Sequence, residues 1–436
     1  MAAPPSITIH RSPFTALRIF DSDRLRWLDE AAAAGPLTEL RLGPLRLFVV
    51  TDADAARTML VTDAAAWTRP PTVLAPIRTA IGENLFSQSD RAWARLQPLV
   101  APSFRSRALA ERLADVDALV DTEVRALPYD EVVDLELAMG RIALIVAAWV
   151  LLGDRLDPDR ADEIARHQRE VVGWVGKRLG ELTGFVPIAA GARGRAMKQQ
   201  REPIREYGDD VIARVRASGE ARDDVLGALL RARPGGKPLS KEQLRGHVLG
   251  LFLAGNETTA AALSWVLVHG ARHPDEWRRV RDDPHALTEA FVTETMRLTP
   301  AVWGVPRTPT RKNVAITVGG TTRRVRRGQP VTINLRGLGR DPQLWDDPLR
   351  FDSARHQRRE TAAQRALIPF GLGPRGCIGQ QLALAELHAV VPALARHGDV
   401  EIDGETRESP QFALRIQGGL RGRFKSPVPS PTVTTD

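Results

Sequence analysis

Most of the chain has the hydrophobic pattern of helices that pack on a core. Between Ala53 and Leu298, apolar residues recur at intervals of three and four, the spacing that places them on one face of a helix. Segments rich in Pro and Gly interrupt the pattern, among them Pro70-Pro71 and Pro234-Gly235-Gly236. One more helix is predicted from Gln380 to about Arg396. The middle of the chain should therefore be mainly α-helical.

Short apolar runs bounded by turns predict small sheets on both sides of this helical region. Leu40–Leu42 and Leu45–Val50 flank a Gly-Pro turn, which is a hairpin signal. Further along, Val314–Val318, a Gly-Gly turn and Val331–Leu335 predict a second hairpin and its continuation. The predicted fold class is mainly α with small β-sheets (α+β).

The longest predicted helix runs from Ser240 to about His273. It opens with Ser240-Lys241-Glu242-Gln243, a capping box in which the Ser and Gln side chains bind each other's backbone amides. At 1.5 Å per residue it would span about 50 Å. Its apolar stretch, Val248–Val268, also fits a membrane span, but Glu257 lies in the middle, where lipid would make a carboxylate costly. We interpret it as a buried core helix and expect no membrane contact.

The composition is that of a folded, globular protein. The 436 residues are 43% apolar and 26% charged, which indicates neither disorder nor a fibrous class. We expect one domain over residues 1–425. In the tail from Ser426 to Asp436, Pro427, Pro429 and Pro431 stand among Ser, Thr and Val, so we expect this tail to be disordered.

Charge and cysteine content limit the partners and the compartment. The net charge of +8 suits nucleic acid, a membrane or an acidic protein, but basic blocks with interleaved aromatic residues are missing and only two Tyr occur. An acidic protein partner is favoured over nucleic acid. The single Cys excludes a disulfide within the chain and a cysteine-pair zinc site, and it fits a reducing cytoplasm. Residues 1–21 lack the apolar run of a signal peptide or membrane anchor.

That single cysteine, Cys377, lies in a glycine-rich segment, Phe370–Gly379, which leads directly into the predicted last helix. Glycines permit tight turns and a close approach to a flat cofactor, and the positive end of the helix favours a thiolate. Two other interpretations of this segment compete with that of a ligand loop. A lone Cys is commonly a small buried hydrophobe, and Gly-rich turns before helices bind phosphate, although the Lys and Ser/Thr of a P-loop are absent here.

The segment matches the haem-binding pattern of the cytochrome P450 family, Phe-x-x-Gly-x-Arg-x-Cys-x-Gly, at every fixed position. It therefore resembles that family's haem-binding loop. The resemblance implies that Cys377 is the thiolate ligand of the haem iron, that Arg375 pairs with a propionate and that Phe370 packs beside the sulfur. Thiolate donation favours cleavage of the oxygen–oxygen bond. The loop residues expected at the haem b cofactor are Cys377, Arg375, Phe370, Gly371 and Gly379.

Ala254–Thr259, in the middle of the long helix, resembles the segment where this family activates oxygen. The resemblance implies that Gly255 leaves room for dioxygen, that Thr258 hydrogen-bonds the oxygen and that Glu257 relays protons through water. The alternative is structural: a buried helical Thr usually bonds to a carbonyl one turn earlier, and Glu257 fits a paired charge. The catalytic interpretation indicates a monooxygenase that uses O2.

Other segments of the chain resemble further family features. Glu294 and Arg297, three residues apart on a helix, resemble its Glu-x-x-Arg pair, whose third member would be Arg355. We expect these three residues to fix the segment before the cysteine loop. Ser353 stands where the family usually has Pro, and Pro392 should kink or shorten the last helix.

Haem contacts are also expected outside the cysteine loop. By resemblance, Trp93 and Arg307 bind propionates. Gln97 occupies a position where the family often has a basic residue, so one contact would be neutral or missing. Apolar residues expected to border the substrate pocket are Leu251, Phe252, Ala254, Ala301, Val302, Trp303 and Val305, although core packing explains such residues equally well.

The resemblance covers about Leu37 to Lys425 and implies a P450-like fold with haem between the long central helix and the cysteine loop. It implies a monomer that inserts one oxygen atom of O2 into a small apolar substrate by hydroxylation or epoxidation. Terpenes, fatty acids, polyketides and other secondary metabolites are candidates. The competing interpretations are a haem-thiolate sensor or carrier without turnover, and a haem-free nucleic-acid protein.

Electrons should come from separate proteins. The family's domain fills the chain, and one Cys cannot hold an iron–sulfur cluster, so a ferredoxin or flavodoxin-type donor with its reductase is implied. An acidic donor would suit a basic face near the cysteine. Its expected contributors are Arg91, Arg95, Arg105, Arg358 and Arg359.

Overall fold

The computed structural model describes residues 5–10, 12–105, 107–180, 192–356 and 361–426, so the predicted tail after Ser426 lies outside the described residues. Helices form most of this part. In the first half they are α1 (Pro13–Ser22), α2 (Arg24–Ala34), α3 (Ala53–Arg57), α4 (Pro71–Ile81), α5 (Asp90–Val100), α6 (Arg107–Leu113), α7 (Val116–Arg125) and α8 (Leu135–Ala147). Those that follow are α9 (Pro158–Gly180), α10 (Ala192–Ser218), α11 (Val225–Arg231), α12 (Lys241–Arg272), α13 (Pro274–Asp282), α14 (Pro284–Leu298), α15 (Leu335–Gly339), α16 (Thr361–Ala366) and α17 (Gln380–His397).

The strands are short, and within the described ranges they form four small sheets. The largest has the order β1 (Ser6–His10), β2 (Leu37–Leu42), β3 (Leu45–Val50), β9 (Val331–Ile333), β6 (Val305–Pro309) and β4 (Trp67–Thr68). The remaining sheets pair β7 (Asn313–Val318) with β8 (Thr321–Arg326), β11 (Glu408–Pro410) with β12 (Leu414–Ile416), and β13 (Arg421–Lys425) with both β10 (Asp399–Ile402) and β5 (Val133–Asp134). The predicted fold class, mainly helical with small sheets, is confirmed.

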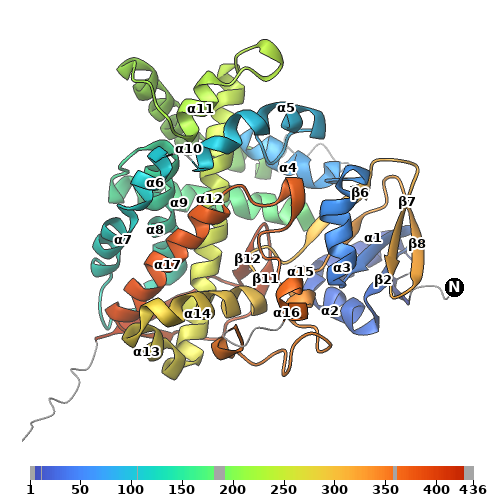
Figure 1. Ribbon diagram of the computed structural model, residues 1–436. Coiled ribbons are helices and arrows are strands. Elements are labelled where there is room, and N and C mark those ends of the chain that lie inside the picture. The colour runs from blue at the N-terminus through green and yellow to red at the C-terminus, as the bar shows by residue number, and fades with distance from the viewer. Residues whose placement is uncertain (1–4, 11, 106, 181–191, 357–360, 427–436) are drawn as a thin grey trace, which may run out of the picture.

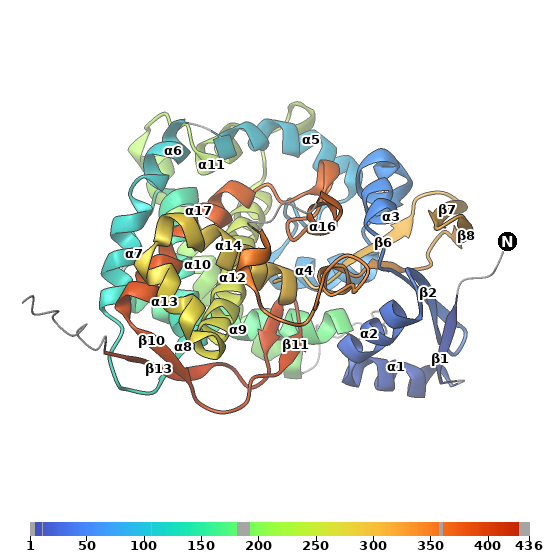
Figure 2. The same ribbon diagram turned by 60° about the horizontal axis from the view of Figure 1, so that its bottom comes forward.

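The main sheet lies toward one end of the molecule with a few helices, and most of the other helices lie toward the opposite end (Figures 1 and 2). Strands β1, β2, β7 and β8 lie with α1, α2 and α3 at the end near the N-terminus, and α6, α7 and α13 lie at the other end (Figures 1 and 2). Helix α12 passes through the middle of the helical part (Figure 1). This helix contacts many other elements, among them α8, α10, α14 and α17.

The first predicted hairpin is confirmed, and the second needs correction. Strands β2 and β3 are antiparallel, whereas β1, which has no clear pattern of its own, adds in parallel to β2. In the second hairpin, Val318 lies opposite Thr321, so the partner of β7 is β8. The expectation that Val331–Leu335 continues this hairpin is wrong. The chain turns at Gly328, where φ is 85°, and β9 then joins the main sheet between β3 and β6.

The long helix α12 begins as the sequence predicts. The Ser240 side chain accepts a hydrogen bond from the backbone of Gln243, whose side chain accepts one from the backbone N–H of Ser240.

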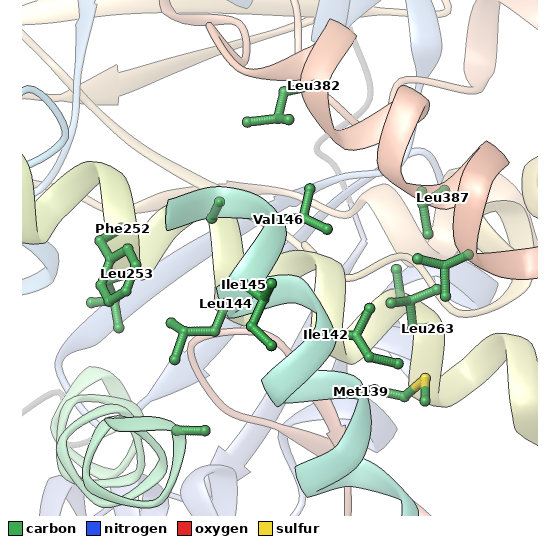
Figure 3. Packing of buried hydrophobic residues seen from close by; sticks show 14 of the residues in the cluster. Met139, Ile142, Leu144, Ile145, Val146, Phe252, Leu253, Leu263, Leu382 and Leu387 are labelled. Atoms are coloured by element: carbon green, nitrogen blue, oxygen red, sulfur yellow. The ribbon is translucent and has the colours of Figure 1, made fainter. Parts of the chain in front are cut away.

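By length and hydropathy, α12 and residues 135–152 could each cross a membrane, but most of both segments is buried inside the protein, as core helices are. Ile142 of α8, Leu263 of α12 and Leu387 of α17 belong to one buried apolar cluster (Figure 3).

Helix α17 continues past its internal proline. Pro392 removes one backbone N–H, yet the helix extends to His397, so the expected shortening did not occur. Val391, Leu394 and Ala395 on either side are fully buried. Burial of these apolar side chains offsets the lost hydrogen bond and holds the helix behind the cysteine loop.

Candidate functional site

A cavity of about 480 Å³ is lined by both α12 and the loop that contains Cys377. Local backbone geometry explains why this loop is rich in Gly. Gly371 and Gly373 have φ values of 68° and 69°, and a Cβ on Gly373 would collide with the carbonyl oxygen of Leu60. The Cys377 backbone N–H donates to the Phe370 carbonyl at 2.9 Å and closes the loop. Both residues then line the cavity, as does Gly371.

Cys377 lines the cavity and is accessible from it, although protein atoms surround the rest of the residue. Burial among protein atoms raises the pKa of the Cys377 thiol, although a hydrogen bond from the backbone of Gly379 lowers it. Gly379 is the residue before α17 and is not part of the lining. The helix end and nearby amides were expected to favour the thiolate. In the protein itself, desolvation raises the pKa of the thiol more than these groups lower it.

Three arginines gather at the same cavity. Arg375 pairs with Asp90 and stacks over Trp93, with its guanidinium carbon 3.8 Å from the ring centroid. Burial, followed by repulsion from Arg375, lowers the pKa of Arg307 to about 10. Burial and repulsion from both neighbours lower the pKa of Arg69 to about 9. Asp90 alone does not balance three cations, so this wall of the cavity favours an anion.

The arginine cluster contains unsatisfied donors. Nη1 of Arg375 and Nε of Arg69 are buried and have no hydrogen-bond partner in the described part of the chain. Trp93 and the neutral Gln97, one turn apart on α5, line the same cavity. Sequence reasoning missed Arg69, because it follows a short strand far from any motif and only the fold brings it to the cluster.

One face of α12 lines the cavity. Leu251, Ala254 and Thr258 are on the lining, and the Thr258 hydroxyl donates to the Ala254 carbonyl at 2.8 Å. Thr259, which was not singled out from the sequence, also lines the cavity and donates to the Gly255 carbonyl. Both hydroxyls thus bond to a carbonyl one turn earlier, as a buried helical Thr with a structural role usually does.

Glu257 faces away from this cavity. Arg415 holds it with two hydrogen bonds of 2.7 and 2.6 Å, and Arg415 also lies 3.6 Å from Glu136. Burial raises the pKa of Glu257, and Arg415 opposes that shift. Sequence reasoning missed Arg415, which follows α12 by more than a hundred residues and carries no motif.

Two residues of α12 that were expected at the site are not part of the cavity lining. A Cβ on Gly255 would meet Ala147 and Leu151 at 3.6 Å, so the space that this Gly leaves lies toward α8 and not in the cavity. Phe252 is absent from the lining and packs against Tyr207, with ring centroids 5.2 Å apart. Each residue is one position from a lining residue, and a helix turns about 100° per residue. The other expected pocket residues line the cavity: Leu251, Ala254, Ala301, Val302, Trp303 and Val305.

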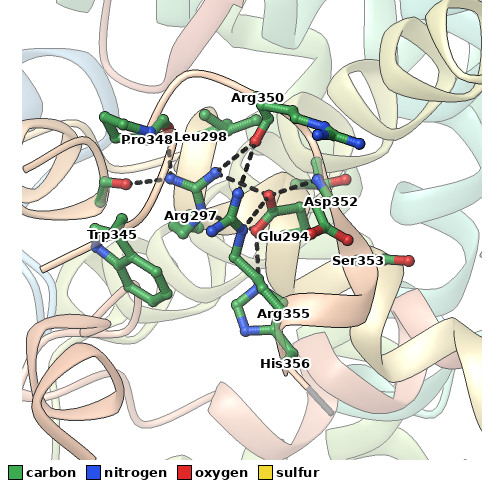
Figure 4. Close-up of polar contacts among 12 residues, drawn as sticks. Glu294, Arg297, Leu298, Trp345, Pro348, Arg350, Asp352, Ser353, Arg355 and His356 are labelled. Atoms are coloured by element: carbon green, nitrogen blue, oxygen red, sulfur yellow. Dashed lines mark hydrogen bonds and ion pairs between the residues drawn. The ribbon is translucent and has the colours of Figure 1, made fainter. Parts of the chain in front are cut away.

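Glu294, Arg297 and Arg355 come together beneath the segment that leads to the cysteine loop (Figure 4). Glu294 and Arg297 are both fully buried and share hydrogen bonds of 2.7 and 2.8 Å, and Arg355 binds the same carboxylate at 3.0 Å. Burial opposes ionisation, but hydrogen bonds from Arg297 and His356 lower the pKa of Glu294 to about 2. His356 was missed, because a His next to Arg355 gives no signal by itself.

Arg297 also binds the chain that follows. It donates to the carbonyl oxygens of Pro348 at 2.7 Å and Arg350 at 3.1 Å, and Glu294 accepts from the backbone of Asp352 (Figure 4). These contacts tie α14 to residues 348–352. The cluster therefore positions the segment before the cysteine loop without lining the cavity.

The residues at the cavity fit a haem. A thiol stands on the wall, unpartnered arginine donors suit two propionates, and most of the lining is apolar. Cys377 would be the iron ligand, and Arg375, Arg307 and Arg69 are placed to bind the acidic edge.

Comparison with known proteins relates the chain to one family. The sequence profile described as Cytochrome P450 matches residues 25–420. Cyclooctat-9-en-7-ol 5-monooxygenase of Streptomyces melanosporofaciens is 27% identical over 85% of this chain and 84% of the relative. Tryptamine 5-hydroxylase of Oryza sativa subsp. japonica is 30% identical over 90% of this chain and 83% of the relative. CYP175A1 from Thermus thermophilus has the same fold, with a TM-score of 0.77 and 21% identity, over 97% of this chain and 100% of that one.

Proposed function

Because the chain belongs to the cytochrome P450 family and is a cytochrome P450 monooxygenase, we propose that it inserts one oxygen atom of O2 into a small apolar substrate. The reaction would be a hydroxylation or an epoxidation of a terpene, fatty acid, polyketide or other secondary metabolite. The observation that carries the proposal is a thiol on the wall of a mainly apolar cavity whose other wall is α12. One relative is named for oxidation of cyclooctat-9-en-7-ol, which supports this substrate class.

We propose haem b as the cofactor, held by Cys377 at the iron, with Phe370 beside the sulfur. When bound, the haem supplies dioxygen binding and activation, which thiolate donation assists. Arg375 and Arg307 would bind the propionates, with Trp93 beside them. Gln97 leaves one propionate contact uncharged. Arg69 lines the same cavity and would supply the missing cation from another element.

Thr258 and Glu257 are proposed to manage protons. Thr258 would hold a proton at Oγ1 on the cavity side of α12. Glu257 would receive protons from the side of the helix that faces away from the cavity. There Arg415 contacts both Glu257 and Glu136, and Glu136 also pairs with Arg169. For Glu257 to serve Thr258, its carboxylate must first leave Arg415, since the two hydrogen bonds hold it away from the cavity.

Electrons would arrive from a ferredoxin or flavodoxin-type donor and its reductase. Arg91, Arg95 and Arg105 are exposed, which supports a basic docking face for an acidic donor, whereas Arg358 and Arg359 lie outside the described residues. We further propose a cytoplasmic monomer in which residues 1–425 form one domain. The large apolar cluster that joins α4, α8, α12 and α17 supports one domain, and Trp303 packs against both this cluster and a smaller one beside the main sheet.

Isotope labelling tests the proposed reaction. The haem-loaded protein, a ferredoxin, its reductase and NADPH are incubated under ¹⁸O2 with a panel of apolar compounds, and the products are analysed by mass spectrometry. We expect products that carry one ¹⁸O atom. Products that carry oxygen from water instead, or no product from any compound that binds, would contradict the proposal.

A further inference from the structure

His247 lies on the same face of α12 as the proposed oxidation site. His247, Leu251, Ala254 and Thr258 all line the cavity and follow one another at intervals of four, three and four. Eleven residues at about 100° each bring His247 to within about 20° of Thr258 around the helix. The same spacing separates them by about 16 Å along its axis. The cavity thus has a polar residue well removed from Thr258.

The imidazole of His247 has an unused hydrogen-bonding atom. The residue is 1% exposed, and its Nδ1 has no partner among the described residues. Its Nε2 lies 3.4 Å from the Nε2 of Gln88, whose amide is in position to donate to the ring. The proton of the imidazole is then on Nδ1, which is left as a buried donor without an acceptor. Such a group is costly unless something binds it.

The neighbouring polar side chain cannot satisfy this donor. Asn84, also on the lining, accepts from the backbone of Phe86 at 3.0 Å and Ser87 at 3.1 Å, and donates to the Gly82 carbonyl at 3.0 Å. The two hydrogen bonds that its amide oxygen can accept are therefore both used in shaping its own loop. Gly250 lets that loop approach closely, because a Cβ there would come within 2.7 Å of the Asn84 side chain. The loop and helix are therefore fixed around His247.

The environment of His247 selects a neutral partner. Burial lowers its pKa to about 4, so the imidazole is uncharged at neutral pH and offers no cation to a carboxylate. The positive charges of the cavity wall are those of Arg24, which lies 3.6 Å from Asp21, and of Arg69, Arg307 and Arg375, which suit propionates. A neutral oxygen is the complementary group for an uncharged ring N–H.

We propose that His247 is a substrate-binding residue that hydrogen-bonds a hydroxyl or carbonyl oxygen at the end of the substrate remote from the oxidised carbon. The substrate is then an apolar skeleton that already carries one neutral oxygen function, and the enzyme adds a second oxygen at a distant position. The inference rests on the proposed monooxygenase function and names its substrate class. An earlier reaction that installs a hydroxyl or carbonyl group on the skeleton must supply such a substrate.

Matched ligands test the inference directly. Haem-loaded wild type is titrated with dodecane, 1-dodecanol and 2-dodecanone, and with adamantane, 1-adamantanol and 2-adamantanone. Binding is followed by the Soret shift and by calorimetry. We expect the oxygenated member of a set that binds to bind about tenfold more tightly than its hydrocarbon. Preference for both alcohol and ketone indicates that Nδ1 donates, and preference for the alcohol alone indicates that it accepts.

Two variants assign the preference to His247. His247→Leu should bind hydrocarbons at least as well as wild type and lose the preference for oxygenated ligands, whereas His247→Asn, which keeps an amide near the position of Nδ1, should retain part of it. Equal binding of hydrocarbon and oxygenated ligands by wild type, binding of neither, or a preference that persists in His247→Leu contradicts the inference. A wild type that has a thiolate-ligated haem but no oxygen preference overturns this inference alone, whereas the absence of such a haem overturns the proposed function.

Discussion

Arg69 and Glu257 illustrate how single residues gain their roles from distant partners. Arg69 is half-buried beside two other arginines, and its buried Nε has no hydrogen-bond partner among the described residues, whereas Glu257 is buried against Arg415. A buried charge without compensation is unfavourable, so each side chain requires a specific partner. The proposed partner of Arg69 is a haem propionate. Glu257 is proposed to move between Arg415 and the oxidation site.

Replacement of Arg69 should weaken haem binding. Arg69→Gln removes one charge-assisted hydrogen bond, which is worth about 1.5–3 kcal/mol, so haem loss should accelerate about tenfold or more. The rate is measured by transfer of haem to excess apomyoglobin. Arg91→Gln, which removes an exposed charge, is the control and should lose haem at the wild-type rate. Equal rates for wild type and Arg69→Gln would exclude the proposed contact.

Replacement of Glu257 should slow turnover without loss of haem. A positioned acid or base contributes about 10²- to 10⁴-fold, so Glu257→Gln should reduce product formation at least about a hundredfold. It should also increase the solvent isotope effect. The haem content and reduced carbon monoxide spectrum report whether the site stays intact. Glu257→Asp, which keeps the carboxylate, should recover part of the rate. Full turnover by an intact Glu257→Gln would refute the proton relay.

Site residues within a short motif could be predicted from the sequence, and those supplied by distant segments could not. Cys377, Phe370 and Arg375 stand in one loop with a recognisable pattern, and all three line the cavity. Arg69 and Arg415 have no local signal, because only the fold brings them to their partners. The roles of all these residues stay predictions.

At the scale of elements, the ion-pair cluster of Glu294 connects α14 to the segment before the cysteine loop.

The elements with a strong local pattern, α12 with its capping box and the β2–β3 hairpin, could be predicted. Strands β4 and β5 could not, since two residues carry no periodicity. The sheet partner of β9 was predicted wrongly, because hydrophobic pattern identifies a strand but not its neighbours.

Loss of Arg297 should destabilise this connection. Arg297→Ala leaves Glu294 buried with fewer partners, so the free energy of unfolding should fall by about 3–5 kcal/mol, and haem retention should fall with it. Thermal and denaturant unfolding measure the change. The control is Arg107→Ala, which removes an exposed pair with Glu111 and should cost at most about 1 kcal/mol. Equal effects of the two substitutions would show that the cluster has no structural role.

At the scale of the whole molecule, the cavity lies among elements from nearly the full length of the chain, from α1 to the turn after β11. The family profile likewise matches residues 25–420. Catalysis is therefore expected to depend on the complete fold, and electron delivery by a separate donor is the proposal made above. The exposed arginines Arg91, Arg95 and Arg105 provide the charge that would attract an acidic donor.

Electron transfer from an acidic ferredoxin should depend on salt. Raising the ionic strength from about 0.01 to 0.5 M shortens the screening length from about 30 Å to a few ångströms, so association should slow. Stopped-flow reduction of the iron at a low ferredoxin concentration measures the rate. Reversal of two charges, Arg91→Glu with Arg95→Glu, should reproduce the high-salt rate in dilute buffer. A rate that neither salt nor charge reversal alters would remove the basic docking face.

The central claim is that Cys377 binds haem iron through its sulfur. The most direct test is the absorption spectrum of the purified protein, reduced and exposed to carbon monoxide, for wild type and Cys377→Ala. The account predicts a strongly red-shifted Soret band in wild type that is lost in Cys377→Ala. A well-folded wild-type protein without that band, or a band that survives in Cys377→Ala, would contradict it.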